Sequence, residues 1–281
     1  MIILEVGCNH RGEFDTAKLL IDAAVVAGAD AVKFQKRNNK ELLPKEQYDA
    51  PHPVPENSYG ATYGEHREFL EFSKEQHAEL KAYCESKGIE YSTSVWDVTS
   101  AQEIASLNPK FIKIPSASNL HFDMLGVLCD TYTGEIHLSL GMTTHQEEEE
   151  IVEFFEKRGK ADSLVLYACT SGYPVPAHEV CLLEITRLQK KFGNRVKSIA
   201  FSGHHISTVP DIAAIALGAS HVERHFTIDR NWKGTDHSAS LEPIHAIQLV
   251  RDVNEIKSAL QFKEKEVLDI EEQQRKKLKW K

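Results

Sequence analysis

Residues 2–34 read IILEVGCNHRGEFDTAKLLIDAAVVAGADAVKF. The short apolar runs at residues 2–6 and 31–34 have the length of buried strands, and residues 16–27 between them carry apolar side chains at helical spacing. Gly28 directly after that stretch suits a left-handed C-terminal helix cap. This stretch therefore predicts a strand, an amphipathic helix and a second strand.

The same alternation continues along the chain. The runs predicted as strands are residues 2–6, 31–34, 89–93, 111–114, 135–138, 164–167, 196–201 and 221–223. Eight such strand–helix units match the size of a (β/α)8 TIM barrel, an α/β fold of about 250 residues. We predict a catalytic barrel over residues 1–260, followed by a short C-terminal helical extension, the charged tail of residues 261–281. An open doubly wound sheet is the alternative, but no G-x-G-x-x-G follows the first strand.

Composition excludes several classes of protein. The 281 residues hold 42 Asp and Glu against 33 Lys and Arg, a formal net charge of -9, which disfavours a general nucleic-acid binder. No apolar run approaches the ~18 residues of a membrane span. The five scattered cysteines form no C-x-x-C pair, which argues against a disulfide framework or a zinc ribbon. We expect a soluble, cytoplasmic protein with no nucleic-acid or membrane partner.

Two predicted loops are longer than usual: residues 37–72, which are rich in proline, and residues 227–241. In a barrel both would follow strands and lie over the mouth. Asp236 in the second loop is a candidate contact to a hydroxylated ligand.

Two lysines interrupt apolar strands, Lys33 between Val32 and Phe34 and Lys113 between two isoleucines. Burying an ammonium group without a counter-anion is costly, so two lysines at one barrel mouth indicate an anionic ligand such as a phosphate or carboxylate. The alternative is that each lysine pairs with a barrel carboxylate, Glu5 or Glu223.

His204 and His225 end consecutive predicted strands. Neighbouring strand ends lie about 5 Å apart, so both imidazoles can reach one divalent ion. A lone barrel histidine is more often a core residue. We expect His205 and His221 to be structural, because alternation directs them away from the mouth.

Other polar residues also fall at strand ends or in the loops that follow them, where TIM barrels carry their chemistry. They are Glu5, Gln35, Thr93, Ser116, Ser139, Ser171, Tyr173 and Ser202.

With these residues located, the chain resembles the N-acetylneuraminate (sialic acid) synthase family, barrel domain only. The shared motifs, in order, are EVGCNHRG at 5–12, GADAVKFQK at 28–36, TYGEH at 62–66, CTSGYP at 169–174, FSGH at 201–204, ERHFT at 223–227 and WKGTDHSASLEP at 232–243.

The resemblance implies a transferase, commonly a homodimer, with a divalent ion, Mn²⁺ or Mg²⁺. Such an enzyme condenses phosphoenolpyruvate with N-acetylmannosamine or its 6-phosphate, releasing phosphate and making a nonulosonic α-keto acid. By motif position His204 and His225 would bind the metal, with Glu5 at the reacting atoms. The phosphoenolpyruvate positions would be Lys33, Thr93, Lys113, Ser116, Ser139, Ser171 and Ser202, and the sugar positions Gln35, Asn57, Tyr173 and Asp236.

Two departures from the family pattern concern the sugar. Residues 115–118 read PSAS where an acidic residue is common, and the chain ends before the C-terminal antifreeze-like domain of many members. We therefore expect an acceptor that can differ from N-acetylmannosamine. The alternatives are a related 3-deoxy-ulosonic acid synthase that uses a non-acetylated aldose, and a non-catalytic sugar-phosphate-binding barrel.

Overall fold

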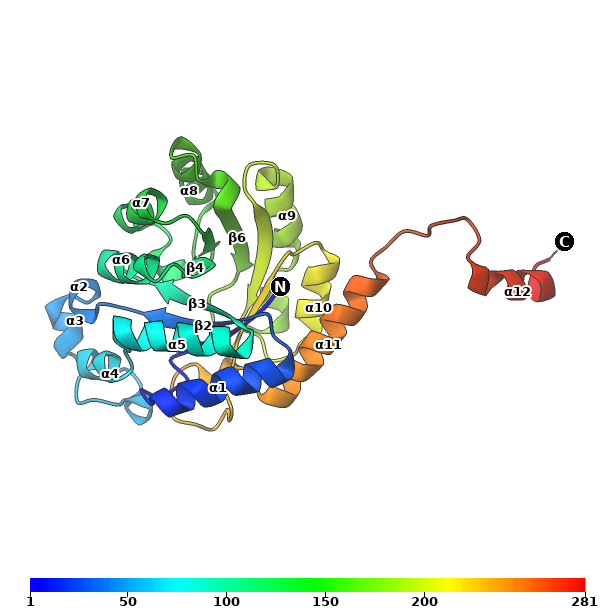
Figure 1. The fold of residues 1–281 in the computed structure, drawn as a ribbon. Helices are drawn as coiled ribbons and strands as arrows, with labels where there is room; N and C mark the ends of the chain where they lie inside the picture. The colour runs from blue at the N-terminus through cyan, green and yellow to red at the C-terminus, as the bar shows by residue number, and fades with distance from the viewer. Residues whose placement is uncertain (281) are drawn as a thin grey trace.

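The computed structural model describes residues 1–280, and its strands form a closed, all-parallel barrel (Figure 1). Each strand pairs with the next along the chain, and β8 closes onto β1. The strands are β1 (Ile2–Gly7), β2 (Ala31–Lys36), β3 (Glu90–Val95), β4 (Phe111–Ile114), β5 (Glu135–Ser139), β6 (Leu164–Cys169), β7 (Ser198–Gly203) and β8 (Val222–His225). The predicted TIM barrel is confirmed.

Helices surround the barrel, and short helices also form within its loops. The α-helices are α1 (Phe14–Ala27), α2 (Asn39–Leu42), α3 (Lys45–Asp49), α4 (Tyr63–Phe69), α5 (Lys74–Lys87), α6 (Val98–Ser106), α7 (Phe122–Thr131), α8 (His145–Lys157), α9 (Leu183–Phe192), α10 (Val209–Ala216), α11 (Pro243–Ala259) and α12 (Asp269–Leu278). Short 3-10 helices are η1 (Pro55–Asn57), η2 (Ser116–Ser118), η3 (Ala161–Ser163), η4 (Ala177–Glu179) and η5 (His237–Ala239).

Local sequence sets the ends of several helices. Ser73 begins α5 and Thr144 begins α8, each in a capping box with the glutamine or glutamate three residues on. Gly28 ends α1 with φ 79°, the left-handed conformation that its position predicts.

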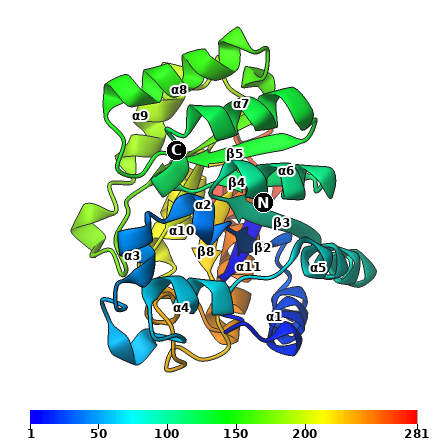
Figure 2. The same cartoon turned by 90° about the vertical axis from the view of Figure 1, so that its left-hand side faces the viewer.

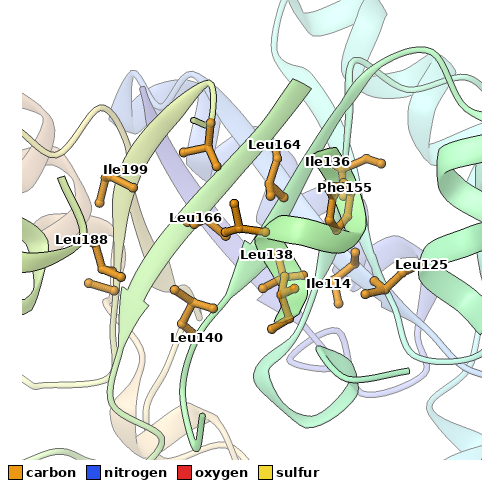
Figure 3. Close-up of a cluster of buried hydrophobic side chains, with 14 of the residues drawn as sticks. Ile114, Leu125, Ile136, Leu138, Leu140, Phe155, Leu164, Leu166, Leu188 and Ile199 are labelled. Carbon is orange, nitrogen blue, oxygen red and sulfur yellow. The ribbon is translucent and has the colours of Figure 1, made fainter. Parts of the chain in front are cut away.

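The main hydrophobic core lies between the strands and the outer helices (Figure 3). Ile136 and Leu138 of β5, with Leu166 of β6, face outward toward Phe155 of α8 and Leu188 of α9. Burying each such side chain contributes about 1.5–3 kcal/mol, so this layer holds the helices on the barrel.

The barrel interior has a separate apolar cluster toward the N-terminal ends of the strands: Ile3, Ala31, Phe111, Val165, Tyr167 and Ala200. The next inward positions toward the C-terminal ends are polar, with Glu5 two residues after Ile3, Lys33 after Ala31 and Lys113 after Phe111. Because inward side chains recur every second residue, the charged layer lies directly on an apolar plug.

The two long loops meet over the mouth of the barrel. The Tyr59 hydroxyl donates to the Lys233 carbonyl oxygen at 2.6 Å, and the Gly234 N–H donates to Asn57 Oδ1 at 3.4 Å. Residues 37–72, predicted as a loop, contain α2, α3, η1 and α4, which lie toward the viewer in Figure 2. Thr62 and Glu65 form a capping box that starts α4.

The predicted C-terminal helix is present as α12, which stands away from the barrel (Figure 1). None of its residues is buried. No helix within residues 1–280 is long and apolar enough to cross a membrane.

Candidate active site

A cavity of about 320 Å³ opens at the C-terminal ends of the strands. That size lies within the range of small-molecule sites. The structure brings together there the predicted residues Glu5, Lys33, Gln35, Lys113, Ser116, Ser139, Ser171, Tyr173, Ser202, His204 and His225.

Four buried charges form the base of this cavity. Lys33 Nζ lies 2.7 Å from Glu5 Oε1 and 3.7 Å from Glu223 Oε1, and Lys113 Nζ lies 2.7 Å from the same Glu223 oxygen. Lys33 also donates to Ser94 Oγ at 2.6 Å. Both lysines are thus paired with carboxylates, as the alternative interpretation of the sequence foresaw. Two positive and two negative side chains are thus grouped together. We call Glu5, Lys33, Lys113 and Glu223 the ion-pair quartet.

Electrostatics keep the two carboxylates of the quartet ionised. Burial by itself would raise the pKa of Glu5, but the positive charges of Lys33, His225 and Lys113 outweigh it and hold that pKa far below its usual range. For Glu223, the effect of burial is likewise overcome by Lys113 and Lys33, and its pKa is lowered. Burial lowers the pKa of Lys113, and Glu223 opposes that shift.

His204 and His225 lie side by side next to the quartet, with ring centroids 5.4 Å apart. His204 Nδ1 contacts the Thr170 carbonyl oxygen at 3.1 Å, so this nitrogen carries the proton and Nε2 is left with a lone pair. Burial, and then the charge of His225, lower the pKa of His204 to about 4, which keeps the ring neutral.

The surroundings of His225 also fit a metal ligand. Its Nε2 lies 3.6 Å from Glu5 Oε2, and its buried Nδ1 has no hydrogen-bond partner within residues 1–280. Imidazole nitrogens beside a carboxylate oxygen suit a divalent transition metal such as Mn²⁺. The residues present therefore fit a divalent ion, which His204 and His225 would hold.

Serine hydroxyls form the opposite wall of the cavity around Gly141. The Gly141 N–H donates to Ser116 Oγ at 3.1 Å. A methyl group at position 141 would lie 2.6 Å from Ser116 Oγ and still closer to Ser171 Oγ. Asn119 fixes this loop, because its Nδ2 donates to the Ser139 carbonyl oxygen at 3.0 Å. A small anion can meet several hydroxyl donors here.

Gln35 is held on both sides of its amide. Its Nε2 donates to Glu5 Oε1 at 2.8 Å, and its Oε1 accepts from the guanidinium of buried Arg37. Arg37 also stacks 4.2 Å from the Trp96 ring and pairs with Glu71 at 3.1 Å. Arg37 therefore positions Gln35 at the edge of the cavity.

The comparison that decides the family covers most of the chain: residues 20–265 match the NeuB family. The chain belongs to the NeuB family. It is 38% identical over 242 residues to the N-acetylneuraminate-9-phosphate synthase of Drosophila melanogaster, a match over 86% of this chain and 64% of that protein. The chain thus spans just under two thirds of the length of this relative.

Two further NeuB-like proteins extend the similarity. The N-acetylneuraminate-9-phosphate synthase of Homo sapiens is 36% identical, over 96% of this chain and 74% of that protein. The solved N-acetylneuraminic acid synthetase of Leptospira borgpetersenii serovar Hardjo-bovis, in complex with citrate, superposes with a TM-score of 0.83 at 27% identity. That superposition covers 100% of this chain and 92% of the other.

Thr93 is one NeuB position for which the sequence prediction needs correction. Its hydroxyl donates to the Tyr91 hydroxyl at 2.5 Å, on the face of β3 that packs against α5, and it does not line the cavity. Ser94 lines the cavity and contacts Lys33. Successive side chains of a strand point to opposite faces, so only one of two adjacent residues can face the barrel interior. In β3 that residue is Ser94.

Asn57 and Asp236, predicted to contact the sugar, lie in the two mouth loops and outside the lining of the cavity. Tyr173 does line it, with its ring 4.3 Å from that of His204. Burial raises the pKa of Tyr173, and the negative charge of Asp236 adds to the rise. The roles of Asn57 and Asp236 remain predictions.

His205 is structural, as predicted. Its Nε2 contacts Asp211 at 3.2 Å and Arg224 at 2.9 Å, and all three side chains are buried.

Four contributors were not among the predicted catalytic, substrate or metal residues: Glu223, Ser94, Arg37 and Gly141. Glu223 was considered only as an ion-pair partner for a lysine. Glu223 had a usable signal, because it precedes His225 by two residues and so shares its inward face. Arg37 and Gly141 had none, because their roles depend on contacts with Gln35 and Ser171 made only in the folded chain.

Proposed function

We propose that this NeuB-family chain is a phosphoenolpyruvate-dependent condensing synthase. It would join phosphoenolpyruvate to an N-acetylmannosamine-like aldose or its 6-phosphate, release phosphate and form a sialic-acid-like nonulosonic acid. The observation that carries the proposal is the ion-pair quartet, two buried lysine side chains paired with carboxylates in a serine-lined cavity beside the two histidines.

Phosphoenolpyruvate suits this cavity because it carries a phosphate and a carboxylate. Each ammonium has three N–H donors, and within residues 1–280 the contacts of Lys113 Nζ are to Glu223 and to the face of the Tyr167 ring. At least one donor of Lys113 is therefore free for the substrate. Ser116, Ser139, Ser171 and Ser202 supply hydroxyls that would orient the two anionic groups.

In the reaction, C3 of phosphoenolpyruvate bonds to the aldehyde carbon and the oxygen of a water bonds to C2. The aldehyde oxygen takes up one of the two water protons and becomes a hydroxyl group. The C–O bond to phosphate then breaks with its electron pair going to the phosphate, the water oxygen becomes the keto oxygen at C2, and the second proton leaves with the phosphate. Glu5 stays ionised in its surroundings, so its role is to stabilise positive charge at C2 or to accept a proton, and not to donate one.

A divalent ion held by His204 and His225, Mn²⁺ or Mg²⁺, would polarise the aldehyde oxygen of the acceptor. Manganese is the ion that the two imidazoles favour, since Mg²⁺ prefers all-oxygen sites. Glu5 Oε2 lies beside His225 and would orient that ring.

The acceptor would lie between the cavity and the two mouth loops, in reach of Gln35, Tyr173, Asn57 and Asp236. Relatives named for a phosphorylated and a non-phosphorylated product both resemble this chain, so both kinds of acceptor belong in the proposal. A non-acetylated aldose, giving a 3-deoxy-ulosonic acid, is the alternative.

The proposal includes a cytoplasmic homodimer. All five cysteines are unpaired, which suits a reducing compartment. Helix α12 and the residues after it expose Ile270, Leu278 and Trp280, apolar side chains that a second copy would cover. Light scattering tests this: we expect the dimer mass, and a monomer at micromolar concentration would contradict it.

The decisive experiment measures phosphate release from phosphoenolpyruvate with Mn²⁺ and a panel of aldoses. The panel holds N-acetylated and plain hexoses, each with and without a 6-phosphate, and mass spectrometry identifies the product. We expect one acceptor class to give turnover that a chelator abolishes and Mn²⁺ restores. Binding of phosphoenolpyruvate by calorimetry without turnover would favour the non-catalytic barrel.

Variants sharpen this experiment. His225→Ala should reduce turnover by at least about 10³-fold, because it removes one of two metal holders. The matched control is His245→Ala, a histidine on α11 outside the cavity, which should leave turnover unchanged. Undiminished turnover in His225→Ala would count decisively against the proposal.

A further inference from the structure

A second cluster of metal-ligating side chains lies at the opposite end of the barrel from the cavity. Glu135 begins β5, His137 follows on the same strand, and His221 directly precedes β8. One ligand atom from each residue lies within 4.8 Å of the others. Strands β5 and β8 are not neighbours in the barrel, so this cluster, which we call the floor cluster, bridges the barrel interior.

His137 is rigidly placed in this cluster. It is fully buried and stacks on Phe111 with ring centroids 4.3 Å apart. Its Nδ1 lies 2.8 Å from the Tyr167 hydroxyl and its Nε2 lies 3.4 Å from Glu135 Oε2. Two ligand atoms 3.4 Å apart match the edge of a tetrahedral site with metal bonds of about 2.0–2.1 Å.

His221 is held at Nδ1, which lies 2.6 Å from the Ser220 hydroxyl oxygen. That hydroxyl also contacts the Ile199 carbonyl oxygen and Ser198 Oγ, each at 2.9 Å. When the hydroxyl donates to either of these oxygens, Nδ1 donates to the hydroxyl and Nε2 keeps a lone pair for a metal. A histidine whose other nitrogen donates to a fixed oxygen is the usual arrangement of a metal ligand.

Glu135 divides its two carboxyl oxygens between two neighbours. Glu135 uses Oε1 for Lys197, at 3.4 Å, which leaves Oε2 facing His137.

A second group of similar composition, His145, Glu148 and Glu184, makes an instructive contrast. Arg187 donates to both carboxyl oxygens of Glu148, at 2.6 and 2.9 Å, and also pairs with Glu184. An arginine already neutralises both carboxylates, so that group offers no site for an ion. In the floor cluster the carboxylate pairs with a lysine, Lys197, through one oxygen only, at 3.4 Å, and its other oxygen faces His137.

We propose that Glu135, His137 and His221 form a second metal site, for a borderline divalent cation such as Zn²⁺ or Co²⁺. Two nitrogens and one carboxylate oxygen are ligands for this class of ion, not for Mg²⁺ or Ca²⁺. Water reaches the fourth position past Glu135, whose side chain is 28% exposed. His137 binds through Nε2 once its proton moves to Nδ1, where the Tyr167 oxygen accepts it.

The bound ion would tie β5 to β8 beneath the active site. Tyr167 contacts His137 on one side, and Lys113 Nζ lies 4.2 Å from the centroid of its ring on the other. The ion would thus fix the ring that supports one lysine of the quartet. The proposal goes beyond the proposed reaction, because its test needs no turnover.

The experiment counts Co²⁺ ions bound to the full chain by equilibrium dialysis and records the visible absorption of Co²⁺ with nitrogen ligands. The double variant His204→Ala/His225→Ala removes the holders in the cavity. We expect this variant to bind one Co²⁺ per chain, displaced by Zn²⁺, and to lose that ion when His221→Ala is added.

Two further variants keep the result interpretable. Glu135→Gln keeps the shape of the side chain and should weaken binding in the double variant at least tenfold, whether or not the His221 variant folds. The control adds His145→Ala, in the group neutralised by Arg187, to the double variant. This change should leave Co²⁺ binding the same as in the double variant. Absence of bound Co²⁺ in the double variant, or unchanged binding after Glu135→Gln, would overturn the proposal.

Discussion

Lys33 and Glu5 face each other across β1 and β2 at matched register, and their charged atoms lie 2.7 Å apart in the barrel interior. Lys113 and Glu223 form a second pair at the same distance. A buried pair contributes little net stability, but removal of one partner leaves an uncompensated charge. Stability and activity should therefore respond differently when these residues are changed.

Lys113→Met should lower the free energy of unfolding by about 3–5 kcal/mol, because Glu223 loses its 2.7 Å partner and keeps Lys33 at 3.7 Å and the neutral Ser202 hydroxyl at 3.3 Å. The double variant Lys113→Met/Glu223→Met should recover most of that loss but no phosphate release. Urea unfolding and the phosphate assay measure the two effects. Lys157→Met, in an exposed pair with Glu153, should change stability by less than about 1 kcal/mol. Recovery of activity in the double variant would show that the quartet has no catalytic role.

Gly141→Ala should raise KM for phosphoenolpyruvate at least about tenfold, because the new methyl group pushes on Ser116 and Ser171. The fold should persist, since only this loop has to shift. Steady-state kinetics and circular dichroism test both statements. Gly126→Ala is the matched control, because the atom nearest its new methyl group is the end of the Arg158 side chain, at 3.2 Å. Unchanged KM in Gly141→Ala would mean that the serine wall does not hold the anion.

Arg37→Lys should lower kcat/KM for the aldose by about tenfold and leave KM for phosphoenolpyruvate within twofold. Lysine keeps the charge that Glu71 needs but cannot bind Gln35, Cys8 and Glu71 with one planar fork. Kinetics at saturating concentrations of the other substrate separate the two constants. An equal loss for both substrates would point to general distortion of the site instead of the positioning of Gln35.

Stability should fall as pH decreases below about 6.5, and His77 is one cause. Burial lowers its pKa to about 3, so between these pH values the unfolded chain binds a proton that the folded chain does not. That difference makes unfolding easier by up to about 1.4 kcal/mol per pH unit. His77→Phe should make the slope of unfolding free energy against pH shallower by about one proton. His178→Phe, whose histidine is 80% exposed, should leave the slope unchanged.

Much of the active site could be predicted from the sequence, because in a TIM barrel the position of a residue along its strand fixes where that residue lies in the barrel. A residue at the C-terminal end of any strand reaches the mouth, so Lys33, Lys113, His204 and His225 could be placed together from their strands alone. Thr93 was the failure at this level. The strand that contains it was predicted correctly. Which of two adjacent residues faces the barrel interior depends on how the strand is set in the sheet, and in the structure Ser94 faces the interior.

The sequence by itself determined the fold, since the apolar periodicity of eight strand–helix units leaves few other ways to bury the apolar surface. It also determined which charged residues enter the barrel. Only the tertiary structure decided which charges pair, that Arg37 holds Gln35, and that Glu135 and His221 meet at the barrel floor. The ion pairs and the floor cluster join strands that lie apart in the chain, and all of these contacts depend on distances of a few ångströms that no local pattern encodes.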